Sequence, residues 1–150
     1  MSGREEIVRL LKEAAASMKT DAKGAVAKLE SAYALVRETG DADDTATVAE
    51  ELARGWMRRR SGARSLYYAA KATKLAPKWK TAWTTLAKTC ELVASKIVAE
   101  DKQVRARALY DKASTAFKTA ATLTKDPEDK RWLLELAADA ARQAKPPRET

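Results

Sequence analysis

Apolar residues recur every three or four positions along most of the chain, which is the spacing of one face of an α-helix. Capping and turn residues interrupt this pattern: Asp21 and Gly40 bound the second segment, and Asp126-Pro127 opens the last one. The pattern predicts seven helices, at about residues 3–19, 21–40, 43–60, 63–75, 78–98, 102–123 and 126–144.

A quartet of residues occurs twice at a shift of 34 residues. Ala49-x-x-Leu52-Ala53-x-x-Trp56 returns as Trp83-x-x-Leu86-Ala87-x-x-Cys90. Between the two lie small residues at helical spacing and then a proline, at Ser65, Ala69, Ala72 and Pro77. Such a quartet, followed by small residues and proline, is typical of stacked helical hairpins.

Similar trios extend the repeat in both directions. Ala25, Leu29 and Ala32 lie 40 residues before the trio at 65, 69 and 72, and Ala113, Phe117 and Ala120 lie 48 residues after it. The last hairpin therefore has 14 extra residues, which is about four helical turns. Divided evenly, they predict two long helices, at 78–98 and 102–123, with the turn near Glu100-Asp101. One domain over residues 1–144 and a disordered tail over 145–150 complete the predicted organisation.

The quartets and the proline resemble the tetratricopeptide repeat (TPR) family, most clearly over residues 46–90. Ala53 and Ala87 stand where the family favours Gly, and Cys90 stands where it favours Tyr. These residues suit a close helix crossing equally well. The resemblance implies an all-α fold of three antiparallel hairpins plus a C-terminal capping helix, stacked as a short right-handed solenoid. It also implies a surface for other proteins.

The lengthened last hairpin is also similar to that of the plant mitochondrial import receptor, a soluble TPR-like domain on a membrane tail. This likeness implies an alternative function as an organelle protein-import receptor subunit. The sequence has no uncharged run long enough for a membrane anchor. A basic surface would also repel the Arg-rich presequences that such a receptor binds. An import role therefore requires a membrane-tethered subunit elsewhere.

Charge is unevenly distributed along the chain. Lys and Arg total 29 against 21 Asp and Glu, a net charge of +8. No acidic residue occurs from Leu52 to Cys90, although ten Lys and Arg fall within that stretch. Helical surfaces normally mix signs, because opposite charges one turn apart stabilise each other by a few tenths of a kcal/mol. This basic stretch therefore indicates an acidic partner.

The TPR resemblance implies that the first helix of each hairpin lines a concave groove in which peptides bind. Helical geometry assigns to that face Arg54 and Lys88, which are 34 residues apart and expected to be neighbours. Arg and Lys on such a wall are suited to bind carboxylates, although exposed charges also occur on any basic surface. The predicted function is a non-enzymatic adaptor that binds an acidic or carboxylate-bearing segment of a partner protein. The predicted groove residues are Arg54, Met57, Arg58, Thr81, Thr84 and Lys88.

A second basic series indicates nucleic-acid binding as another alternative. Arg64, Tyr67, Lys71 and Lys74 occur at spacings of three, four and three, so they share one helical face. Lys and Arg interleaved with Tyr suit a phosphate backbone with stacked bases. The structural alternative is a solvated convex face, next to a last helical turn whose basic residues stabilise the helix dipole. The predicted stripe comprises Arg59, Arg60, Arg64, Tyr67, Lys71 and Lys74.

The composition argues against catalysis. The chain has no His, so it lacks the usual general base near neutral pH and a common zinc ligand. Cys90 is expected to be a packed small residue, because no His is present to activate it. No glycine-rich phosphate loop or calcium loop occurs. We therefore expect no enzyme activity, no cofactor, no metal and no small-molecule substrate.

Two further expectations concern location and packing. A single cysteine suits a reducing compartment, and acidic residues near the start of the sequence argue against a signal peptide. A cytoplasmic protein is therefore expected, without direct membrane insertion. Trp56, Trp83 and Trp132 fall at or beside repeat packing positions, so we expect them in the core.

Overall fold

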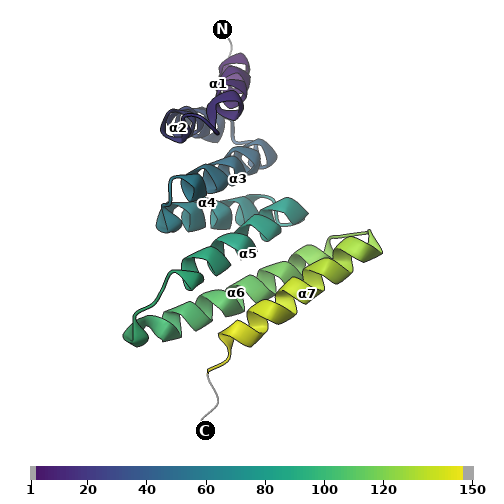
Figure 1. The fold of residues 1–150 in the computed structure, drawn as a ribbon. Helices are drawn as coiled ribbons and strands as arrows, with labels where there is room; N and C mark the ends of the chain where they lie inside the picture. The colour runs from purple at the N-terminus through teal and green to yellow at the C-terminus, as the bar shows by residue number, and fades with distance from the viewer. Residues whose placement is uncertain (1–2, 147–150) are drawn as a thin grey trace. The chain divides into compact units, whose positions relative to one another are not determined.

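The computed structural model describes residues 3–146, and this part of the chain contains helices and connections but no strand (Figure 1). The helices are α1 (Gly3–Ser17), α2 (Ala22–Thr39), α3 (Ala42–Arg58), α4 (Gly62–Leu75), α5 (Lys80–Ser95), α6 (Gln103–Thr122) and α7 (Pro127–Ala144), with a 3₁₀ turn at Glu100–Lys102. The predicted all-α fold with seven helices is therefore confirmed for these residues. The predicted tail at 145–150 falls mostly outside the described residues.

Helices pack against their neighbours in the chain, and this packing forms two compact units. The first unit, Met1–Pro77, contains α1 packed on α2, α2 on α3, and α3 on α4. The second unit, Lys78–Thr150, contains α5 packed on α6 and α6 on α7. Because the connections between packed neighbours are short, consecutive helices within a unit are antiparallel, as in helical-repeat proteins.

The small-residue trios form the helix crossings that the sequence predicts. Their nine members on α2, α4 and α6 are all buried: Ala25, Leu29, Ala32, Ser65, Ala69, Ala72, Ala113, Phe117 and Ala120. Small side chains let helix backbones approach closely, and the buried polar member finds a partner at the crossing. Ser65 on α4 donates its hydroxyl to the backbone carbonyl of Ala53 on α3, at 2.7 Å.

Aspartates cap three of the helices. Asp21 accepts a backbone N–H of the first turn of α2 at 2.9 Å, and Asp126 accepts one from α7 at 3.1 Å. Both caps are predicted from the sequence. The cap of α3 is Asp41, whereas the sequence predicts a start at Asp43 or Asp44. These two carboxylates lie in the first turn, where the helix dipole stabilises negative charge.

An arginine occupies the turn that ends α3. The N–H of Arg60 donates to the carbonyl of Met57 at 3.0 Å, and the N–H of Ser61 donates to that of Trp56 at 2.9 Å. These two bonds are those of a Schellman motif. The motif places Arg60 in the left-handed region, with φ of 60°. Glycine is favoured at such a position because a Cβ atom costs energy there.

The predicted equal lengthening of both helices in the last hairpin is wrong. α5 ends at Ser95 rather than near Val98, and the N–H groups of residues 96 and 97 bond three residues back, at 3.2 and 3.1 Å. The β-branched pair at 97–98 disfavours a further helical turn. The side chain of Gln103 donates to the carbonyl of Ile97 at 3.1 Å and closes the connection. The extra residues therefore lengthen α6 and the connection before it.

The tryptophans divide between core and surface. Trp56 is 7% exposed, so its predicted core position is confirmed, and Trp83 is half-buried. Trp132 is 60% exposed, so its predicted core position is wrong. α7 buries the face that carries Leu133 and Ala137, and Trp132 is turned about 100° away from Leu133 around the helix axis.

Candidate binding site

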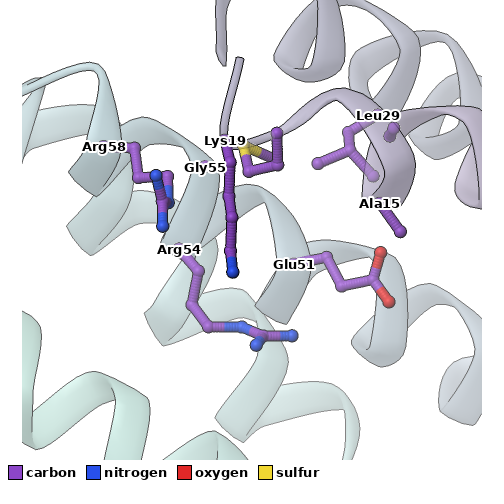
Figure 2. A pocket seen from close by; sticks show the side chains of 9 residues that line it. Ala15, Lys19, Leu29, Glu51, Arg54, Gly55 and Arg58 are labelled. Atoms are coloured by element: carbon purple, nitrogen blue, oxygen red, sulfur yellow. The ribbon is translucent and has the colours of Figure 1, made fainter. Parts of the chain in front are cut away.

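A pocket of about 460 Å³ lies among α1, α2 and α3 of the first unit (Figure 2). We call it the α1–α3 pocket. Its volume is within the range of typical ligand sites, about 300–1,000 Å³. Five of its lining residues are apolar or lack a side chain, and four are charged. They are Ala14, Ala15, Met18, Leu29 and Gly55, and Lys19, Glu51, Arg54 and Arg58.

Gly55 lets α3 approach α2 closely beside the pocket. A Cβ atom at this position would lie 2.9 Å from Cγ2 of Val26 and 3.2 Å from Cε of Met18. Val26 is fully buried and β-branched, so its side chain has little freedom to move aside. A larger residue at position 55 would therefore disturb the helix crossing and fill part of the pocket.

Three cations line the α1–α3 pocket (Figure 2). Arg54 and Arg58 are four residues apart on α3 and so share one face of that helix. Lys19 follows α1, and the short turn into α2 brings it to the pocket. The sequence predicts Arg54 and Arg58 as site residues. It misses Lys19, because that position depends on the path of the α1–α2 connection.

A buried carboxylate holds Arg54 in place. Nε of Arg54 lies 2.8 Å from Oε1 of Glu50, one turn earlier on α3. Glu50 is 3% exposed, whereas the side chain of Arg54 is 63% exposed. The contact uses the Nε side of the guanidinium, which carries four further N–H donors on its terminal nitrogens. The spacing of four residues is the sequence signal for this pair.

Glu51 is the acidic member of the pocket lining. Burial raises the pKa of its carboxyl group, and the neighbouring Arg54 partly opposes that shift. Desolvation disfavours the charged form of a carboxyl group, so ionised Glu51 costs free energy in the folded protein. The three cations outnumber the two carboxylates of Glu50 and Glu51, so the pocket has a net positive charge at pH 7.

A second hollow, of about 340 Å³, lies toward the other end of α1, α2 and α3. Its apolar lining includes Ile7, Leu11 and Val48, and its charged lining comprises the acids Asp41 and Asp44 and one cation, Arg4. The acidic residues stand at the start of α3, whereas the cations of the α1–α3 pocket stand near its end. Charge therefore changes sign along the same set of helices.

The other predicted groove residues lie outside the α1–α3 pocket. Met57 is half-buried on α3, and Thr81 is exposed on α5 of the second unit. Thr84 donates its hydroxyl to a backbone carbonyl one turn earlier on α5, at 3.1 Å. Lys88 lines a hollow of about 510 Å³ within the second unit, together with the carboxylates of Glu91 and Asp139. Lys88 thus has acidic neighbours in its own unit.

The residues of the predicted nucleic-acid stripe lie on another face of the first unit. The guanidinium carbons of Arg59 and Arg64 lie 5.2 and 4.5 Å from the ring centre of Trp56. Nζ of Lys71 lies 5.9 Å from the ring centre of Tyr67. The remaining predicted members are Arg60, in the left-handed turn, and Lys74, exposed near the end of α4.

Cys90 is the one cysteine of the chain, and it is fully buried. Burial raises the pKa of its thiol to about 11, so the thiolate is scarce at neutral pH. Across residues 3–146, no three His, Cys, Asp or Glu residues are grouped so that they could hold a metal ion. Over the same residues, no helix has the length and apolar character needed to cross a membrane.

The architecture defines an all-α protein of packed helical hairpins with a cationic pocket in its first unit. No protein-family model matches the chain, and no curated protein is significantly similar to it in sequence. The likeness to TPR proteins therefore rests on the repeat spacing.

Proposed function

We propose that the protein is a non-enzymatic, TPR-like adaptor of the cytoplasm that binds an acidic segment of a partner protein in the α1–α3 pocket. The convergence of Lys19, Arg54 and Arg58 on one largely apolar pocket is the observation that carries this proposal. The groove roles of Met57, Thr81, Thr84 and Lys88 stay sequence-based predictions.

The charge of the pocket favours carboxylates of the partner. Two guanidiniums one turn apart offer forked donors, which bind carboxylate oxygens in bidentate fashion. Glu50 fixes Nε of Arg54, so less side-chain freedom is lost when a ligand binds. Lys19 adds a flexible ammonium from the connection between α1 and α2. A partner with two or more neighbouring Asp or Glu residues satisfies all three cations.

The apolar lining favours a large apolar residue next to those acidic residues. Met18, Leu29 and Gly55 give the pocket uncharged lining beside the cations. Burying one Leu or Phe side chain contributes about 1.5–3 kcal/mol, more than an exposed ion pair, which contributes about 0.2–1 kcal/mol. The favoured ligand is therefore an apolar residue flanked by carboxylates.

The acidic hollow sets the direction in which such a segment lies. Asp41 and Asp44 stand near the start of α3, and they repel carboxylates of the partner. Arg54 and Arg58 stand near its end. The acidic residues of the segment therefore lie toward the end of α3, and neutral or basic residues lie toward its start.

The test uses the full chain and fluorescent peptides of about twelve residues that combine a central Leu with Asp and Glu. Arg54→Gln with Arg58→Gln should weaken binding about tenfold, because two exposed ion pairs contribute roughly 1.4 kcal/mol together. The control removes two cations elsewhere, with Lys12→Gln on α1 and Lys130→Gln on α7. Equal losses in both double variants would show that net charge alone attracts the peptide, and the site would be wrong.

Glu51 provides an independent check. Because ionised Glu51 repels an acidic ligand, Glu51→Gln should raise the affinity several-fold at pH 7. A peptide with Asn and Gln in place of its acids should bind weakly to both proteins. No change on Glu51→Gln would place the peptide away from the α1–α3 pocket.

A further inference from the structure

The face of the first unit that carries Trp56 has a cationic surface that the adaptor function does not use. Glu30 on α2 supports this surface, because its carboxylate accepts hydrogen bonds from side chains on α3 and α4. Nε1–H of Trp56 on α3 donates to Oε1 of Glu30 at 2.9 Å, and the hydroxyl of Tyr68 on α4 donates to Oε2 at 2.7 Å. Both aromatic rings are thereby held in fixed orientations by one carboxylate.

Two guanidiniums lie over the indole of Trp56, which is hydrogen-bonded to Glu30. The guanidinium carbons of Arg59 and Arg64 lie 5.2 and 4.5 Å from the same ring centre of Trp56. They are therefore no farther apart than the sum of these two distances, which is about one Debye length at physiological ionic strength. No acidic residue occurs between positions 52 and 90, and the acidic group bonded to the same indole is the carboxylate of Glu30. Two like charges held together in this way form a site prepared for an anion.

An exposed aromatic ring continues this surface along α4. Tyr67 is 55% exposed, and Nζ of Lys71 lies 5.9 Å from its ring centre. The ring of Tyr67 also meets that of Tyr68 edge to face, with ring centres 5.1 Å apart. Glu30 fixes the ring of Tyr68, and contact with that ring restricts the motion of Tyr67. The rest of the Tyr67 ring remains exposed to solvent. Arg64 lies one turn before it on the same helical face.

The aromatic and cationic series also extends onto α2. The ring of Tyr33 packs edge to face against Tyr68, with ring centres 5.2 Å apart. Arg37, one turn farther along α2, lies with its guanidinium carbon 5.6 Å from the ring centre of Tyr33. Cations from α2, from α4 and from the end of α3 thus lie beside aromatic rings that are joined by ring contacts or by Glu30.

We infer that this surface binds single-stranded nucleic acid, with Arg59, Arg64 and Lys71 on the phosphates and a base stacked on Tyr67. Phosphate groups match the paired guanidiniums, and every base offers a flat face to an exposed aromatic ring. An acidic polypeptide would use the cations but not the ring. A duplex hides the base faces within its stack, so the single strand is the better match.

The test measures fluorescence anisotropy of a labelled oligouridylate of about ten nucleotides with the full chain, as a function of salt concentration. Tyr67→Ala should weaken binding about tenfold, because loss of one stacked base has an effect of that order. Tyr67→Phe keeps the flat ring and should bind almost as well as the original protein. Arg64→Gln with Lys71→Gln should reduce the slope of log affinity against log salt by about 1.4, because each phosphate contact on a single strand contributes about 0.7.

The matched control is Arg54→Gln with Arg58→Gln, which removes the same charge from the α1–α3 pocket. This control should lower the affinity for the acidic peptide, and Tyr67→Ala should still lower the affinity for RNA in its background. Failure of the adaptor proposal can therefore be distinguished from failure of the nucleic-acid inference. Equal binding of single-stranded and duplex RNA, with no effect of Tyr67→Ala, would overturn the inference. Preferential binding of an oligoglutamate of matched charge would also overturn it and assign the surface to an acidic protein.

Discussion

The carboxylate of Glu30 connects α2 to α3 and α4, so its removal should destabilise the first unit more than any exposed charge would. It accepts the indole N–H of Trp56 at 2.9 Å and the hydroxyl of Tyr68 at 2.7 Å. A hydrogen bond to a charged acceptor contributes about 1.5–3 kcal/mol, and the lower value applies because both bonds are only partly buried. Glu30→Ala should therefore cost about 3 kcal/mol of unfolding free energy.

Glu30→Gln separates the hydrogen bonds from the charge. Its amide oxygen still accepts from Trp56, and its amide nitrogen donates to the Tyr68 oxygen, so geometry is kept while charge assistance is lost. We expect a cost of about 1 kcal/mol, because a neutral pair is roughly half as strong. The measurement is urea unfolding followed by far-ultraviolet circular dichroism.

Glu38→Ala is the matched control for both variants, because it removes an exposed carboxylate from the same helix. It should change the unfolding free energy by less than about 0.5 kcal/mol, as surface substitutions usually do. Equal costs for Glu30→Ala and Glu38→Ala would refute the proposed role of Glu30. Equal costs for Glu30→Ala and Glu30→Gln would show that charge, and not the two hydrogen bonds, determines the effect.

Three further predictions concern packing, strain and pH. Gly55→Ala should destabilise the protein by about 1–3 kcal/mol in urea unfolding, because its Cβ would lie 2.9 Å from Val26; a stabilised variant would contradict the tight crossing. Arg60→Gly should stabilise the protein by about 0.5–1 kcal/mol, since φ is 60° there, and Arg60→Ala should not match that gain. Burial, and next the hydrogen bond to Glu30, raise the pKa of Tyr68 above its usual value. A raised folded pKa means that the protonated hydroxyl stabilises the fold below about pH 10 and that this contribution is lost as the pH rises further. The stability difference between the original protein and Tyr68→Phe should therefore shrink above pH 10, and a constant difference from pH 8 to 11 would contradict this reasoning.

The candidate site was only partly accessible from sequence. Arg54 and Arg58 are found from helical spacing and from the acid-free stretch that begins at Leu52. Lys19 and Glu51 are not, because their place in the pocket depends on the α1–α2 connection and on how α1 and α3 each pack on α2. The repeat spacing predicts Lys88 beside Arg54. Within its own unit, Lys88 lines a hollow together with the carboxylates of Glu91 and Asp139. Repeat spacing predicts the equivalent position on a helix, but the charge around that position comes from other helices.

Local spacing along the chain determined the helices, their aspartate caps at Asp21 and Asp126, and the buried small-residue trios. These features follow from hydrogen bonds and apolar periodicity within a few residues, so the sequence alone suffices for them. Tertiary structure decided which charges meet in the α1–α3 pocket, how Glu30 holds Trp56 and Tyr68, and why Trp132 is exposed. Those outcomes depend on contacts between residues far apart in the chain, and the direction in which one helix packs on the next sets them.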